Sequence, residues 1–172
     1  IPDAYTRKGI IAKVVAVGAA LGAQIQAKVL TDKLNAELIA AERKSSSYHG
    51  VRKKVLFILS TRGGKILASG SNTAADSIIK MAGGINAISE FSGYKPLSAE
   101  SITVAAPDVL IMMDRGGDHV TENEKLFSKP AISTTPAAKT KSIIRMNGLY
   151  LLGFGPRTAS AVSDLHSALY PE

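Results

Sequence analysis

Residues 54–60 read KVLFILS, an apolar run that ends at Ser60. A run of this length without polar alternation is typical of a strand buried on both faces, as in parallel sheets. Two similar segments follow, VLIMM at 109–113 and KSIIRM at 141–146. Helical patterns and one short strand, at 85–88, separate these segments; the helices are expected at 73–81, 98–105, 121–127 and 158–169. This alternation predicts an α/β lobe over residues 51–172, a small parallel sheet with helices on both faces.

The first 50 residues do not follow the alternation, because two successive helices precede the first strand. Asp3 or Thr6 is expected to cap the first helix, and Gly22 to end it. A helix as apolar as residues 10–21 needs a surface to pack against. We therefore interpret residues 1–22 as a connecting helix from a preceding domain. Residues 23–50 are expected to be a helix and linker that pack on the lobe.

Length and composition narrow the function classes. The chain has 172 residues, of which 45% are hydrophobic and 20% charged, and its net charge is +7. These values are typical of a globular protein with one core. With no cysteine, disulfides, thiolate metal sites and cysteine nucleophiles are excluded. With no tryptophan and scattered basic residues, we expect no nucleic-acid partner. No apolar stretch reaches the length of a membrane span.

Ligands of such sheets meet the loops at the carboxyl ends of the strands. Here those loops are residues 61–72, 114–120 and 147–157, all rich in glycine. Arg115 offers a planar fork suited to a carboxylate. His119 is a weak candidate metal ligand, alone or with Asp114 and Asp118, although a lone loop histidine is more often simply exposed to solvent. Arg157 either holds its turn to the sheet or reaches the cleft.

The segment Gly70-Ser71-Asn72-Thr73 precedes a predicted helix. Backbone N–H groups at a helix start bind anionic groups, but a simple cap by Asn72 or Thr73 with Asp76 in a capping box is the more ordinary interpretation. No nucleophile, base and acid combine in the sequence, and no G-x-S-x-G elbow is present. The sequence therefore favours a binding protein over an enzyme.

Three blocks resemble the C-terminal lobe of haem-specific periplasmic substrate-binding proteins of ABC importers. They are VLFILSTRGGKILASGSNTAADSIIKMAGGINA, GYKPLSAESITVAAPDVLIMM and LYLLGFGPRT, at residues 55–87, 93–113 and 149–158. The resemblance implies a lobe of the class III periplasmic binding protein fold, with haem held between two lobes that one long helix joins. The N-terminal lobe, which usually supplies an iron-binding tyrosine, is expected to be absent, and no tyrosine of this chain matches that position.

The resemblance also implies roles for individual residues. Arg62, Arg115, Gly116 and His119 fall in the haem cleft, and Glu100 matches the glutamate that docks to the membrane permease. The implied apolar wall is formed by Ile66, Leu67, Met112 or Met113 and the region of Phe154. We expect haem as the transported ligand, with weak or no binding to this chain alone.

The resemblance implies two partners: haem, and an ABC permease with its ATPase at the inner membrane. It also implies that the protein works in the periplasm of a Gram-negative bacterium. Self-association of the isolated lobe is a further expectation, since the lost lobe would leave apolar surface exposed. The chain starts with Ile1 rather than Met and shows no signal peptide, so we interpret it as a processed or excised piece. Two alternatives stay open: a siderophore or cobalamin carrier of the same fold, and a small α/β enzyme acting on a phosphorylated substrate.

Overall fold

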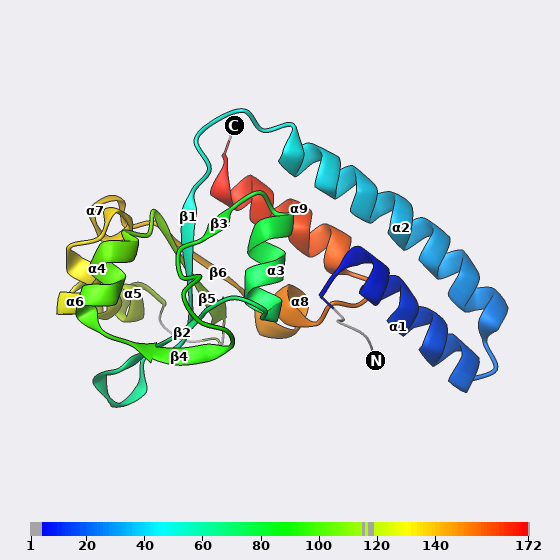
Figure 1. Ribbon diagram of the computed structural model, residues 1–172, viewed down its shortest axis with the longest axis horizontal. Coiled ribbons are helices and arrows are strands. Elements are labelled where there is room, and N and C mark those ends of the chain that lie inside the picture. Colours follow the sequence, from blue (N-terminus) through cyan, green and yellow to red (C-terminus); the bar gives the residue numbers. More distant parts are fainter. Residues whose placement is uncertain (1–4, 115, 117–118, 172) are drawn as a thin grey trace.

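A sheet of mostly parallel strands forms the centre of the protein (Figure 1). The computed structural model describes residues 5–114, 116 and 119–171, and only the backbone of residues 119–121. The strands in this part are β1 (Lys54–Ser60), β2 (Ile66–Ser69), β3 (Ile85–Asn86), β4 (Tyr94–Leu97), β5 (Val109–Asp114) and β6 (Ile143–Asn147). Their order is β4–β2–β1–β5–β6, and β3 pairs with the first residues of β1.

The predicted parallel strands are confirmed, and two strands that were not expected run antiparallel. β1 pairs in parallel with β3 and β5, and β5 in parallel with β6. β2 and β4 add an antiparallel extension beside the carboxyl half of β1. Residues 61–72 are therefore not one open loop. Gly63 and Gly64, at φ 63° and 75°, reverse the chain in the 3₁₀ turn η1 (Arg62–Gly64), and β2 returns from it.

Helices cover both faces of the sheet, as predicted (Figure 1). β1 alternates between two cores, since Val55 and Phe57 belong to one buried cluster and Leu56 and Ile58 to the other. The helices on the first side are α1 (Arg7–Ala20), α2 (Gln24–Ser46), α3 (Ala74–Met81), α8 (Gly148–Leu152) and α9 (Thr158–Leu169). Those on the second side are α4 (Ala99–Ala105), α5 (His119–Phe127), α6 (Pro130–Ser133) and α7 (Pro136–Thr140).

Three short helices were missed in the sequence. α6 and α7 each begin with a proline at the first turn, where a missing N–H costs nothing. α8 lies inside the expected loop 147–157, and the Asn147 side chain caps it by accepting from the backbone N–H of Tyr150 at 3.0 Å. Helices of four or five residues show too little of the 3.6-residue period to be recognised.

The two lead-in helices form a hairpin beside the lobe (Figure 1). Thr6 caps α1, and its hydroxyl accepts from the N–H of Gly9 at 3.1 Å. Ile10, Leu34 and Leu38 are fully buried and join the core at the inner end of the hairpin. Gly18 allows the two helices to approach closely, because a Cβ there would lie 2.3 Å from Cβ of Ala27.

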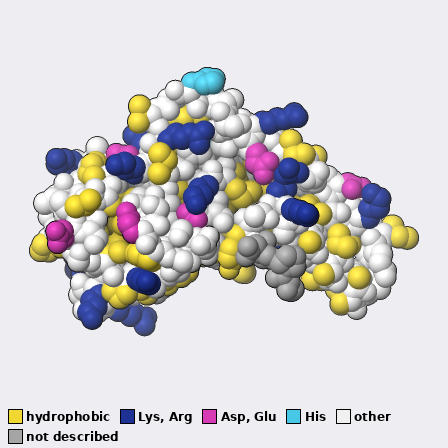
Figure 2. Space-filling view, in the orientation of Figure 1, with side chains coloured by type: hydrophobic (Ala, Val, Ile, Leu, Met, Phe, Trp, Pro, Cys, Tyr) yellow, Lys and Arg dark blue, Asp and Glu magenta, His cyan; other side chains and the backbone are white. Residues whose placement is uncertain are grey.

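The outer end of the hairpin carries exposed apolar side chains, which we call the hairpin patch. Figure 2 shows hydrophobic surface gathered over this end of the molecule. Its exposed members are Val15, Val17, Leu21, Ile25 and Val29, between 49% and 80% exposed. No helix in the described part of the chain is both long and apolar enough to span a membrane. The division of the chain at residues 22 and 50 stays a prediction.

Candidate functional site

The carboxyl ends of β1, β5 and β6 meet at one edge of the sheet, because these strands are parallel and adjacent. Arg62 lies in η1 directly after β1, with an exposed side chain. Gly116 follows β5 at φ 74°, and its N–H donates to Oδ1 of Asp114 at 2.8 Å. The structure thus brings Arg62 and Gly116 to the ends of neighbouring strands, as the sequence predicts.

Three candidate residues lie wholly or partly outside the described part of the chain. Arg115 lies outside the described residues, and so does Asp118. His119 begins α5, but its side chain also lies outside the described part. Among the described residues, no group of three or more carboxylates and histidines is arranged to hold a metal ion. The roles of Arg115 and His119 therefore stay predictions.

A pocket of about 350 Å³ opens at this edge, between the end of β1 and α5, and we call it the edge pocket. Leu59, Met112 and Met113 contribute apolar surface to it. Its charged lining residues are Arg62, Glu122, Lys125, Lys129 and Arg145. Four cations against one carboxylate make the pocket electropositive. Figure 2 shows Lys and Arg side chains gathered over the turn after β1, at the lower left of the view.

Arg145 is a largely buried cation of the edge pocket. It lies in β6 opposite Met112 of β5, and its side chain is only 12% exposed. Nε donates to Oδ1 of Asn123 at 2.9 Å, and Nη2 lies 3.4 Å from Oε2 of Glu122. α5 therefore holds one edge of the guanidinium. Sequence reasoning missed Arg145, although an arginine inside the apolar run 141–146 was a signal that could have found it.

Glu100 lies at the same edge of the sheet but does not line the edge pocket. It stands in the first turn of α4, which Ser98 caps by accepting from the N–H of Ser101 at 3.1 Å. Leu97 ends β4 beside Ile66, which starts β2 just after the η1 turn. The exposed Glu100 is thus presented at the rim, with Val104 on the same helix 79% exposed.

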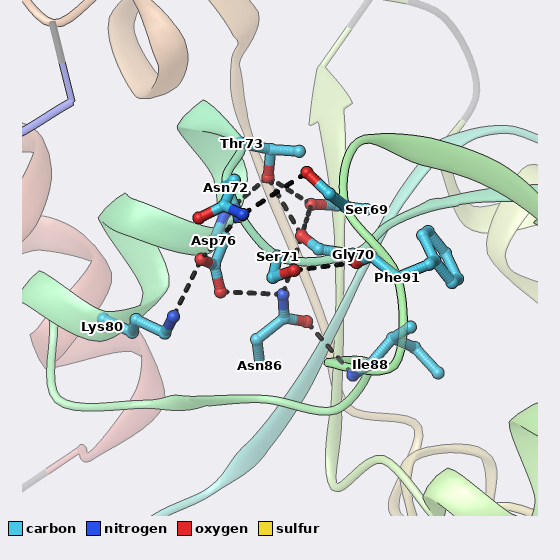
Figure 3. A network of polar contacts seen from close by, with 11 residues as sticks. Ser69, Gly70, Ser71, Asn72, Thr73, Asp76, Lys80, Asn86, Ile88 and Phe91 are labelled. Carbon is cyan, nitrogen blue, oxygen red and sulfur yellow. Dashed lines mark hydrogen bonds and ion pairs between the residues drawn. The ribbon is translucent and has the colours of Figure 1, made fainter. Parts of the chain in front are cut away.

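The residues around Gly70 and Asp76 form a network of hydrogen bonds, which we call the loop network (Figure 3). Thr73 caps α3, because its hydroxyl accepts from the N–H of Asp76 at 3.0 Å. The buried Asp76 carboxylate accepts from Asn86 Nδ2 at 3.0 Å, from Lys80 Nζ at 2.8 Å and from the N–H of Asn72 at 3.2 Å. The predicted cap by Thr73 is confirmed, although Asp76 accepts from the N–H of Asn72 rather than from that of Thr73 as in a capping box. A carboxylate thus already occupies the region where an anion would bind.

The expected apolar wall needs one correction. Ile66 and Phe154 are 3% and 2% exposed and belong to the two cores, so neither presents a surface to a ligand. Leu67, Met112 and Met113 are half-buried. Arg157 lies over the ring of Tyr150 at 5.5 Å, which agrees with a role in holding its turn.

Tyrosine ionisation also bears on the site, because ferric iron binds the phenolate form. Burial raises the pKa of Tyr94, Tyr150 and Tyr170 above the ordinary tyrosine value. A raised pKa disfavours the phenolate form, so each of these phenols stays protonated to a higher pH than an exposed tyrosine. The expectation that the chain supplies no iron-binding tyrosine stays a prediction.

Most of the chain matches a known protein family. Residues 3–148 match the family model described as periplasmic binding protein. An uncharacterised ABC transporter substrate-binding lipoprotein, YvrC of Bacillus subtilis, is 22% identical over 172 residues, which are 100% of this chain and 53% of the relative. The chain therefore spans about half the length of this curated relative.

Solved structures share the fold over nearly the whole chain. The periplasmic haem-binding protein BhuT, in complex with two haems, is 33% identical with a TM-score of 0.90; 96% of this chain and 63% of BhuT are covered. The periplasmic haem-binding protein RhuT of Roseiflexus sp. RS-1 is 35% identical with a TM-score of 0.89, and the coverage is 96% and 64%. An ABC-type Fe³⁺-hydroxamate transport system of Saccharomonospora viridis, 18% identical with a TM-score of 0.81 and coverage of 96% and 56%, shares the fold alone.

Proposed function

The chain belongs to the periplasmic binding protein family, and we propose that it forms the C-terminal lobe of a haem carrier that delivers haem to an ABC importer. The observation that carries the proposal is the similarity to two haem-binding proteins, at 33% and 35% identity over 96% of the chain. In this proposal the carboxyl edge of the sheet forms one wall of the haem cleft, and a second lobe supplies the other wall and the iron-binding tyrosine.

The edge of the sheet has the chemistry that such a ligand requires. Haem carries two propionates, and the four cations of the edge pocket attract negative charge. The half-buried Met112 and Met113 offer apolar, polarisable surface beside those cations. We propose Arg62, Arg115, Gly116 and His119 as cleft residues, with Arg62 and Arg115 interacting with propionates. His119 is proposed only as a weak candidate for the iron.

Glu100 is proposed to dock to the permease at the inner membrane, with the associated ATPase driving uptake from the periplasm. Its position supports this role, because it is exposed at the rim in the first turn of α4. A permease bound at Glu100 would contact both the glutamate and the edge of the cleft, because the two lie on the same side of the lobe.

A siderophore or cobalamin carrier is the runner-up, since a hydroxamate transport protein shares the fold. An enzyme for a phosphorylated substrate has less support. The loop network fills the start of α3 with the Asp76 carboxylate, which would repel a phosphate.

A haem titration of the protein with both lobes tests the proposal. We expect a Soret shift with the character of tyrosinate ligation at micromolar haem, and no competition from a hydroxamate siderophore or from cobalamin. No spectral change at micromolar haem would refute the haem proposal. For residues 1–172 alone we expect weak or no haem binding, because one wall of the cleft is missing; tight one-to-one binding by this chain would contradict that expectation.

A further inference from the structure

We propose that the edge pocket is a carboxylate-binding subsite whose central receptor is Arg145, and that Glu122 occupies this receptor when no ligand is bound. The inference deepens the proposed function and rests on it for the identity of the ligand, whose propionates would supply the carboxylate. The same chemistry is found in small organic polycarboxylates, so the two sources are distinguished experimentally.

The first support is the placement of Arg145. The Arg145 side chain is 12% exposed and lies in a strand that pairs with Met112 and Met113, so its charge is costly to bury unless an anion matches it. Asn123 carries no charge, and its Oδ1 accepts the hydrogen bond from Nε of Arg145. Oε2 of Glu122 lies 3.4 Å from Nη2 of Arg145, and the Glu122 side chain is 57% exposed. The receptor thus already holds a carboxylate, and that carboxylate reaches in from the solvent side.

The second support is the surplus of positive charge around Arg145. Within the described part of the chain, no acidic side chain forms an ion pair with Arg62, Lys125 or Lys129, which line the same pocket. Lys125 lies on α5 and Lys129 is the residue before α6, and both line the edge pocket. Glu122 pairs with Arg145, one of the four cations, so a ligand carboxylate that replaces it there also meets the positive charges of the other three.

The third support is size. A pocket of about 350 Å³ accommodates a carboxylate arm and its attached methylenes, with Leu59 and Met113 beside the methylenes. A whole porphyrin ring would have to lie outside, against the carboxyl edge of the sheet. A ligand with an apolar body outside the pocket and one or two carboxylate arms inside it fits this arrangement.

The direct test uses ¹⁵N-labelled residues 1–172 and follows the Arg145 Nε–H resonance during titration with succinate. We expect a saturable shift that succinic diamide, the matched neutral compound, does not produce. Arg145→Met should weaken succinate binding by about tenfold or more, equivalent to about 1.4 kcal/mol. Glu122→Gln should strengthen it several-fold, because the internal competitor loses its charge. These opposite signs are specific to the proposed exchange.

Control variants keep the test independent of folding. Lys125→Met and Lys129→Met remove pocket cations from solvent-facing positions and should also weaken binding, whereas Lys139→Met, on α7 outside the pocket, should not. Equal loss in all three lysine variants would indicate a general charge effect and overturn the proposal. Inorganic phosphate shifting the resonance as strongly as succinate would overturn the carboxylate assignment.

The second arm compares haemin with its dimethyl ester in the protein with both lobes. We expect the ester to bind more weakly than haemin in the wild type, and this difference to shrink in Arg145→Met. An unchanged difference, with haem still bound, would overturn the inference while the proposed function stands. If haem fails to bind but succinate still shifts Arg145, the proposed function fails and the pocket is assigned to small polycarboxylates.

Discussion

Asp76→Ala tests whether the loop network stabilises the edge of the sheet. The Asp76 side chain is buried and accepts from Asn86, from the backbone N–H of Asn72 and from Lys80. Asn86 is 7% exposed, so losing its charged acceptor costs about 2 kcal/mol. Asn72 is exposed, so water replaces part of its bond and the loss is about 1 kcal/mol. The Lys80 side chain is 61% exposed and adds at most about 0.5 kcal/mol.

We therefore expect Asp76→Ala to lower the free energy of unfolding by about 3 kcal/mol, measured by urea denaturation followed by circular dichroism. Lys80→Met is the matched control, because it removes only the exposed partner and should cost about 0.5 kcal/mol or less. A double-mutant cycle with Asn86→Ala should show a coupling of about 1 kcal/mol or more. A loss below about 1 kcal/mol for Asp76→Ala, or equal losses for Asp76→Ala and Lys80→Met, would refute the reasoning.

Three further predictions concern docking, association and pH. Glu100→Arg should abolish haem uptake by cells that depend on the importer while leaving haem affinity unchanged in titration; normal uptake would remove the docking role. The double variant Leu21→Glu, Ile25→Glu should lower any concentration-dependent association of residues 1–172, measured by sedimentation. Both side chains belong to the hairpin patch and are at least 75% exposed. Val51→Glu is the control, because Val51 is also exposed but lies outside the patch. Burial raises the folded-state pKa of Tyr170, which also donates to the carbonyl of Gly83 at 2.9 Å, above the ordinary value of about 10. Its contribution to stability is therefore present below pH 10 and is lost as the pH rises through the folded-state pKa; the wild type should lose more stability between pH 9 and pH 11 than Tyr170→Phe, and identical losses would show that Tyr170 is not responsible.

Much of the lobe was predictable because its strongest signals are local. The run 54–60 corresponds to β1 residue for residue, and the last helix was also expected at its observed bounds. Ser98 was predicted as a cap, and Thr6 and Thr73 were each one of two predicted candidates. The structure shows each of these three hydroxyls accepting a backbone N–H. Caps and long periodic runs depend on neighbouring residues, so tertiary structure has little to add to them.

The antiparallel strands were not predictable in the same way. β2 and β4 have four residues each, and both flank turns that look like open loops. They form strands because the edge of β1 is available to pair with β2, and β2 in turn with β4. A short strand is stabilised by the neighbour that pairs with it, and that neighbour lies elsewhere in the chain.

The candidate site was likewise predictable only in part. The sequence by itself determined the α/β class and the exposed turn that carries Arg62, since the alternation of strands and helices along the chain and glycine-rich turns are local features. Only the tertiary structure decided that Arg145 of β6 joins Lys125 and Lys129 around one pocket, and that Ile66 and Phe154 are core residues. The physical reason is that the face on which a strand residue lies, and the helix that covers it, follow from packing between segments far apart in the sequence.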